Sequence, residues 1–183
     1  MYERYEIRLA GSGGQGLVLA GVILGEAASV YENLYAVQSQ SYGPEARGGA
    51  SKSEVIIGTQ AVSYPKATCP DLLLALTQES YDKYAKATRK GGYIVYDSEA
   101  VEPKPETEWK QIGIPITDLA RKEIGREMVV NIIALGIIQE LTKVVTLDAL
   151  KKAVANRVPK GTEAINHKAL QVGIDAMSRH TSR

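Results

Sequence analysis

The chain opens with a short apolar strand, a glycine-rich turn and a long apolar helix. The strand is expected at residues 7–10, the turn GSGGQG occupies residues 11–16, and the helix begins at Leu17. Glycine lets the backbone adopt positive φ and approach a ligand where a Cβ atom would collide. The first N–H groups of a helix are unpaired and lie at its positive end, so they attract phosphate. This order of elements predicts an α/β fold whose first turn is a candidate ligand site.

The turn formally matches the G-x-G-x-x-G pattern of dinucleotide-binding proteins. Those proteins hold the ribose 2′-hydroxyl with an acidic side chain about 20 residues further on, at the end of the second strand. Here that strand is expected near residues 34–37, and the sequence QSQS follows it without a carboxylate. Glu32 precedes the strand and is expected at its opposite end. The turn is therefore not interpreted as an NAD site.

Two interpretations of the glycines remain open from these residues alone. In one, the turn binds a phosphate-bearing ligand. In the other, the glycines permit a tight turn and close packing of the helix on its strand, with no ligand.

Length and charge exclude several classes of protein. The 183 residues fit one domain, residues 1–183. A net charge of +1, from 22 basic and 21 acidic residues, gives no electrostatic reason to expect nucleic acid or an anionic membrane as partner. No apolar run approaches the roughly 20 residues that span a bilayer, so a cytoplasmic location is expected.

The sequence contains few candidate metal ligands. Cys69 is the only cysteine, so the chain forms no internal disulfide and cannot by itself ligate a four-cysteine iron–sulfur cluster. His167 and His180 have no companion at metal-ligand spacing. No metal site is expected, and any redox metal would belong to another chain.

Short strand patterns alternate with helical ones along the rest of the chain. The strands predicted at residues 53–57 and 61–64 are expected to form a hairpin, which makes the sheet mixed. The C-terminal third is predicted to be helical and to pack on the sheet, with Asn131 as a buried amide bonded to a neighbouring loop. The fold class is a three-layer α/β/α, Rossmann-like open mixed sheet. Further strands are predicted at residues 72–76, 93–96 and 109–114, and helices at 78–89, 116–124, 128–141, 147–158 and 162–177.

A second informative segment, QSYGPEARGGASKSEV at residues 40–55, follows the second strand. Arg47 offers a planar fork to a phosphate or a carboxylate. Alternatively the loop is structural and Glu45 pairs with Arg47 or a neighbour. Because the segment follows a strand, it is expected beside the glycine turn, at the edge where open α/β sheets bind ligands.

Together these segments resemble the gamma subunit of 2-oxoacid:ferredoxin oxidoreductases. The resemblance rests on GSGGQG, on QSYGPEARGGASKSEV, and on three later motifs in the same order along nearly the whole chain. It is strongest for the short gamma chain of the 2-oxoglutarate type, and it extends to the equivalent domain of pyruvate, ketoisovalerate and indolepyruvate enzymes. The later motifs are YP at residues 64–65, DLLLAL at 71–76 and VNIIALG at 130–136.

The resemblance implies a subunit of a multi-subunit oxidoreductase. Such enzymes decarboxylate a 2-oxoacid on thiamine diphosphate with Mg²⁺, pass electrons through 4Fe-4S clusters to ferredoxin, and transfer the acyl group to coenzyme A. The thiamine and the clusters would lie on the alpha and beta subunits and, where there is one, a delta subunit. The isolated gamma chain is expected to be inactive.

The resemblance also implies roles for two sets of residues. The turn would face coenzyme A or a partner chain, and the second segment would form the adjoining loop. No catalytic acid, base or nucleophile is assigned. The alternative functions are an assembly subunit without a ligand and, less favoured, a stand-alone nucleotide-binding protein. The candidate residues are Gly11, Ser12, Gly13, Gly14, Gln15 and Gly16 in the turn, and Tyr42, Gly43, Pro44, Glu45, Arg47, Gly48 and Gly49 in the loop.

Overall fold

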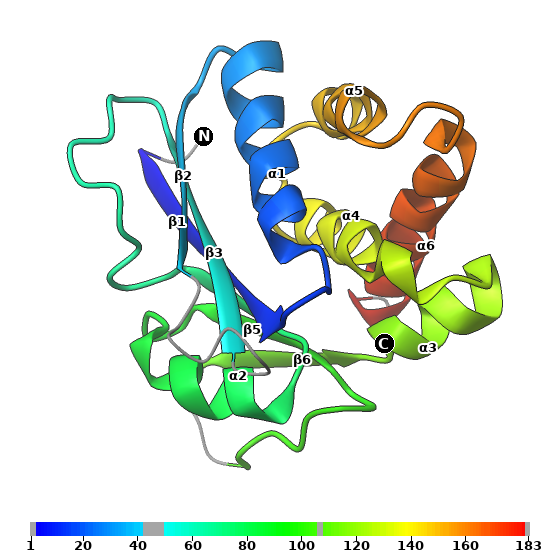
Figure 1. The fold of residues 1–183 in the computed structure, drawn as a ribbon. Coiled ribbons are helices and arrows are strands. Elements are labelled where there is room, and N and C mark those ends of the chain that lie inside the picture. Colours follow the sequence, from blue (N-terminus) through cyan, green and yellow to red (C-terminus); the bar gives the residue numbers. More distant parts are fainter. Residues whose placement is uncertain (1–2, 42–49, 106–107, 182–183) are drawn as a thin grey trace.

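The chain forms a six-stranded mixed sheet, which confirms the predicted sheet type (Figure 1). The computed structural model describes residues 3–41, 50–105 and 108–181. The strand order is β2-β3-β1-β4-β5-β6; β1, β4, β5 and β6 run parallel, and β3 is antiparallel to both β1 and β2. The strands are β1 (Arg4–Ser12), β2 (Tyr35–Ser41), β3 (Ala50–Gly58), β4 (Leu72–Ala75), β5 (Tyr93–Asp97) and β6 (Lys110–Ile114).

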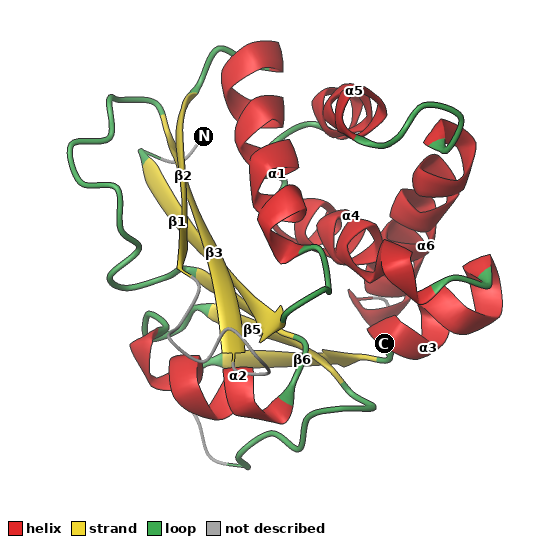
Figure 2. Cartoon of the chain, viewed as in Figure 1, coloured by secondary structure: helices red, strands yellow, loops and turns green. Residues whose placement is uncertain are grey.

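Helices cover both faces of the sheet, as the three-layer prediction requires (Figure 2). The short α2 lies on one face, and α1, α4, α5 and α6 lie on the other. In the described parts of the chain, no helix is long and apolar enough to cross a membrane. The helices are α1 (Leu17–Tyr31), α2 (Gln78–Tyr84), α3 (Ile116–Leu119), α4 (Val130–Thr142), α5 (Leu147–Arg157) and α6 (Glu163–Thr181), with short helical turns at Ala85–Ala87, Ala120–Ile124 and Glu127–Val129.

Alternation along the central strands divides the apolar core between the two faces. In β4, Leu72 and Leu74 join the large core under the helical layer, whereas Leu73 and Ala75 join a smaller cluster under α2 with Tyr81. Successive side chains of a strand point to opposite faces, so a strand covered on both sides is apolar throughout. The unbroken LLLA sequence of β4 therefore reflects its central position.

The predicted hairpin between residues 53–57 and 61–64 is wrong. Residues 61–64 form no strand, and β3 is paired on both sides, with β2 on one edge and β1 on the other. Because β1 and β2 occupy both edges of β3, residues 61–64 cannot pair with β3. They belong to a loop over the α2 face, where the Tyr64 carbonyl accepts a hydrogen bond from Arg4.

A buried ion pair lies between β1 and β3 on the α2 face. Arg8 Nε donates to Glu54 Oε1 over 2.8 Å, and its Nη2 donates to the Ala67 carbonyl over 2.6 Å. Lys52 Nζ donates to the same Glu54 oxygen over 2.8 Å. The Tyr84 ring of α2 covers the cluster, with the Arg8 guanidinium carbon 5.4 Å from its centroid. Each buried charge thus has a partner, as burial of charge requires.

Two glycines allow α4 and α6 to pack backbone against backbone. A Cβ atom at Gly136 would overlap the Leu170 carbonyl oxygen, and one at Gly173 would overlap the Ile133 carbonyl oxygen. Both helices are predicted from the sequence, and the prediction that the C-terminal third packs on the sheet is confirmed.

Candidate functional site

The glycine turn lies at the carboxyl end of β1, where it leads into α1 (Figure 1). The side chain of Gln15 closes the turn from inside, because its Oε1 accepts the Ser12 N–H over 2.8 Å. The Ser51 hydroxyl of β3 donates to the Gly11 carbonyl over 3.3 Å. Gln15 therefore has a structural task within the turn.

Two of the four glycines are required by the fold itself. Gly16 adopts φ +71°, and a Cβ atom there would lie 2.6 Å from Asn131 Nδ2. Asn131 is buried at the start of α4 and donates to the Gly16 carbonyl over 3.1 Å, so the predicted amide-to-loop bond is confirmed. At Gly11 a Cβ atom would overlap the Gln15 side-chain oxygen. These two positions support the packing interpretation of the turn.

Gly13 and Gly14 are different, because both are exposed and the fold leaves open space beside them. No heavy atom of a described residue lies within 4 Å of a Cβ atom added at either position. Gly14 adopts φ +89°, whereas Gly13 does not have positive φ. Within the described residues, neither N–H group forms a hydrogen bond. As far as the described residues are concerned, the tip of the turn therefore has N–H donors without a partner and a backbone that no side chain covers.

The beginning of α1 adds to this arrangement. Gly16 occupies the N-cap position without a side-chain cap, and the first turn of α1 contains no acidic residue. Its N–H groups and the positive end of its dipole are thus uncompensated by a side chain. This is the electrostatic environment that a phosphate group favours.

Only the two ends of the second predicted segment, residues 40–41 and 50–55, belong to the described part of the chain. Its flanks lie at the same edge as the turn, because Ala50 of β3 pairs with Ser12 and Ser41 of β2 pairs with Lys52. The candidate residues between these flanks lie outside the described residues. They are Tyr42, Gly43, Pro44, Glu45, Arg47, Gly48 and Gly49.

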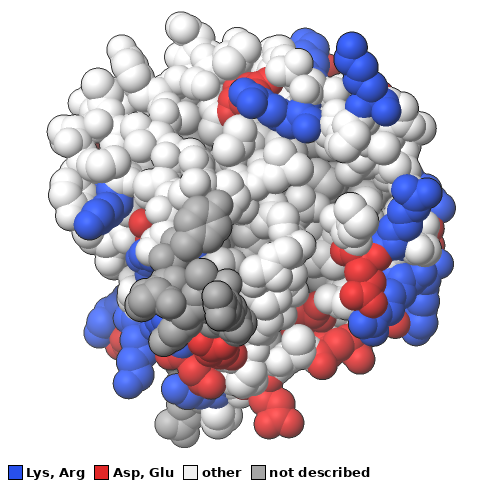
Figure 3. Space-filling model, in the orientation of Figure 1, with Lys and Arg blue, Asp and Glu red and all other residues white. Residues whose placement is uncertain are grey.

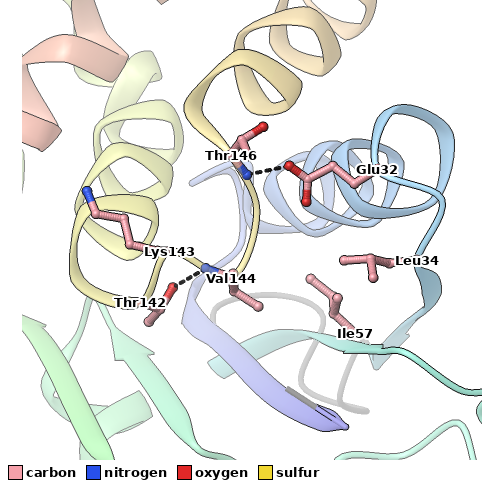
Figure 4. A pocket seen from close by; sticks show the side chains of 7 residues that line it. All are labelled: Glu32, Leu34, Ile57, Thr142, Lys143, Val144 and Thr146. Carbon is pink, nitrogen blue, oxygen red and sulfur yellow. Dashed lines mark hydrogen bonds between the residues drawn. The ribbon is translucent and has the colours of Figure 1, made fainter. Parts of the chain in front are cut away.

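Glu32 lies at the opposite edge of the sheet, as the sequence predicted. It follows α1 and lines a cavity of about 410 Å³, where its Oε1 accepts the Thr146 N–H over 2.6 Å (Figure 4). The Thr142 hydroxyl in the same cavity accepts the Val144 N–H over 3.2 Å. Glu32 therefore lies too far from the glycine turn to hold a ribose bound there. This agrees with the prediction that the turn is not an NAD site of the usual dinucleotide-binding type.

Clear pKa shifts occur away from the glycine turn. Burial, with a smaller effect of Tyr81, raises the pKa of Tyr96 at the end of β5. The Glu108 carboxylate raises the pKa of Lys90, and Asp118 does the same for Lys122, both on the surface. Neither the turn nor the described residues that hydrogen-bond to it have a titratable side chain, so the described part of this arrangement suits binding and positioning rather than proton transfer.

The described residues contain no group of three or more His, Cys, Asp or Glu side chains that could hold a metal ion. With one cysteine in the whole sequence, the chain also lacks the ligands of a four-cysteine cluster. The chain by itself therefore does not supply the four thiolates that an iron–sulfur cluster of this type requires.

Sequence reasoning missed the exposure of Met128. It was expected inside a helix spanning residues 128–141, but it lies in the short turn Glu127–Val129 that precedes α4, with 88% of its surface exposed. In the sequence, the first apolar residue of the run that begins at Met128 looks the same as the buried residues that follow it. Only the packing of α4 against α6 decides which side chains remain outside.

The open sheet, with its glycine turn at the carboxyl edge, defines the Rossmann-like class of α/β domains. Comparison with known proteins narrows this class. The model of the family described as pyruvate ferredoxin/flavodoxin oxidoreductase matches residues 6–176. The chain therefore belongs to this family, as a gamma-type subunit of the 2-oxoacid oxidoreductases.

Individual relatives agree with this assignment. A 2-oxoglutarate synthase subunit KorC of Methanocaldococcus jannaschii is 48% identical over 174 residues, covering 94% of this chain and 93% of the relative. The solved gamma subunit of a keto/oxoacid ferredoxin oxidoreductase from Geobacter sulfurreducens is 49% identical, with a TM-score of 0.87 over 96% of this chain and 99% of that one.

A third comparison supports the fold alone. A 2-oxoglutarate:ferredoxin oxidoreductase from Magnetococcus marinus, solved with 2-oxoglutarate, coenzyme A and succinyl-CoA, has a TM-score of 0.86 at 22% identity. The match covers 98% of this chain but 32% of the larger one.

Proposed function

We propose that the chain is the gamma-type subunit of a 2-oxoglutarate:ferredoxin oxidoreductase, or of an enzyme for a related 2-oxoacid. In this proposal residues 1–183 act as one domain in a cytoplasmic complex with alpha and beta subunits and, where present, a delta subunit. Thiamine diphosphate, Mg²⁺ and the 4Fe-4S clusters belong to those subunits, which pass electrons to ferredoxin. The named relatives that the chain matches along nearly its whole length support this proposal.

We further propose that the tip of the glycine turn contacts the coenzyme A that accepts the acyl group. The observation that carries this is at Gly13 and Gly14, beside the uncapped start of α1: no described residue fills the space there or accepts a hydrogen bond from their N–H groups. These donors would bind the phosphates of coenzyme A and orient it, while the turn residues take no part in proton transfer.

A second candidate is that the same turn only permits close approach of a partner subunit. The exposure of Gly13 and Gly14 supports this as well, because a neighbouring chain can approach a glycine backbone as closely as a ligand can. The two functions predict different effects of a side chain at the tip of the turn. It would weaken coenzyme A binding in the first and subunit assembly in the second.

The experiment is Gly13→Val in the assembled enzyme. Gly13 is preferred to Gly14 because it has no positive φ, so a side chain there adds no such backbone strain. We expect the KM for coenzyme A to rise at least about tenfold, which corresponds to about 1.4 kcal/mol of lost binding. The KM for the 2-oxoacid and the subunit stoichiometry should not change. The control is Gly25→Ala in α1, the helix that follows the turn, where an added Cβ atom would meet no atom closer than 3.9 Å.

Loss of assembly in Gly13→Val, with the chain still folded, would favour the assembly function instead. An unchanged KM with full assembly would exclude both contacts at the tip of the turn. Circular dichroism of the isolated variant chain verifies that it is folded in each case.

A further inference from the structure

Helix α1 is apolar on almost all sides although part of it faces solvent. Its only charged residue, Glu26, is buried and pairs with Arg157 of α5. Val18, Leu19 and Val22 are half-buried and, at their helical spacing, form one stripe on the outer side. A helix that is apolar all round is normally enclosed by protein, and here the described residues do not enclose it.

An apolar pocket of about 220 Å³ continues this stripe toward the start of α4. Leu19 forms one wall, and Met128, almost wholly exposed, stands at its rim. The pocket contains Asn131, so it lies directly beside the glycine turn to which Asn131 is bonded. The remaining apolar lining comes from Val129, Ile132, Val158 and Ile165.

The surrounding surface is uncharged over a wide area. Figure 3 shows most Lys, Arg, Asp and Glu side chains around the margin of this face, while the part of its centre that described residues form, over the first half of α1, carries none. Large exposed areas of this kind mark sites of protein–protein contact, because their removal from water is favourable and desolvates no charge.

Of the described residues that line the pocket, Arg126 alone is charged. Arg126 lines the pocket, and no described side chain forms an ion pair or hydrogen bond with its guanidinium. The neighbouring carboxylate, Glu127, is engaged by Arg121. Neither α1 nor α4 has an acidic residue in its first turn. Among the described residues, the lining of the apolar pocket therefore carries one positive charge without an ion-pair partner.

We propose that this face, formed by Val18, Leu19, Val22, Met128 and the pocket with Arg126, is where the chain docks on another subunit of its enzyme. The partner contributes an apolar side chain that fills the pocket and a carboxylate that pairs with Arg126. A second copy of this chain fits less well, because a two-fold interface would bring two copies of the same face together, and with them two Arg126 side chains and no carboxylate from the lining to pair with them. The proposal does not depend on coenzyme A contact.

The test uses the complete enzyme, assembled from this chain and its co-expressed partner subunits. Met128→Asp and Arg126→Glu are each expected to weaken binding to those subunits at least tenfold, measured by titration and by native mass spectrometry. Both side chains are exposed, so the isolated variants should melt like the parent chain. Tyr64→Asp and Lys66→Glu, exposed on the loop over the other face of the sheet, are matched controls that should bind normally.

A photo-crosslinking amino acid in place of Met128 identifies the surface that this position contacts. The expected crosslink joins a peptide of another subunit that contains an apolar residue and an Asp or Glu within a few positions. Parent-like binding of both variants would overturn the proposal, as would crosslinks solely between copies of this chain. Normal assembly of Gly13→Val together with failure of Met128→Asp would separate this face from the coenzyme A proposal.

Discussion

At the scale of single residues, four glycines of one motif have different tasks. Gly11 and Gly16 are required by packing within the chain, because a Cβ atom would meet Gln15 or Asn131. Gly13 and Gly14 face space that no described residue fills, so packing within the described part of the chain does not require a glycine at either position. The motif GSGGQG predicts the turn but does not distinguish these positions, since the atoms that decide lie far away in the sequence.

The buried Glu54 carboxylate makes stability depend on pH. Burial alone would raise its pKa, but the hydrogen bond from Lys52 and the charges of Arg8 and Lys52 lower it below its ordinary value of 4.5. A carboxyl group with a lowered pKa stabilises the fold above about pH 4.5, and this contribution is lost as pH falls through the lower, folded value.

We therefore expect the melting temperature of the parent chain to fall steeply below about pH 4.5. Glu54→Gln should be less stable at pH 7 by about 1.5–3 kcal/mol, the usual contribution of hydrogen bonds to a charged group, and should lose less on acidification. Glu108→Gln, which removes an exposed partner of Lys90, is the control and should follow the parent. Parallel acid profiles for Glu54→Gln and the parent would contradict this explanation.

At the scale of elements, helix and strand patterns are mostly predictable, and their pairing is less so. The alternating and apolar patterns locate β1, β4, β5 and the C-terminal helices, since these patterns reflect which faces are covered. The hairpin prediction failed because β3 uses both edges for β1 and β2. Strand partners depend on competition among all edges, which a local turn signal does not contain.

The α4–α6 contact should be the helix pair most sensitive to added volume. Gly136→Ala and Gly173→Ala each place a Cβ atom on a backbone carbonyl of the other helix and should destabilise the chain by about 1–3 kcal/mol. This outweighs the gain of about 1 kcal/mol from replacing glycine in a helix.

Gly25→Ala in α1 is the matched control, because its Cβ would meet nothing closer than 3.9 Å. Its stability should be unchanged or slightly increased in denaturant unfolding. If Gly136→Ala and Gly173→Ala also stabilise the chain, the two helices do not pack through these glycines.

At the scale of the whole molecule, one sheet connects two apolar clusters. The large cluster lies under α1, α4, α5 and α6, and the small one under α2 includes Tyr81 and packs against Trp109. Strands β1, β4 and β5 contribute to both, so neither cluster can come apart while the other remains intact. This arrangement favours one cooperative folding unit.

Two spectroscopic probes test this expectation. Trp109, the only tryptophan, reports on the α2 face, and far-ultraviolet circular dichroism reports mainly on the helical layer. Both should give one unfolding midpoint in urea and the same midpoint within error. A tryptophan transition at lower urea would show that the α2 face unfolds separately.

The sequence by itself determined the strand–turn–helix opening, the mixed α/β architecture, the helical C-terminal third and the family. These features depend on local backbone preferences and on the period of apolar residues, which neighbouring positions encode. Only the tertiary structure decided which strands pair with β3, that Asn131 secures Gly16 across 115 positions, and that Met128 stands exposed at an apolar pocket. Each of these depends on contacts between distant segments, and such contacts exist only once the chain has folded.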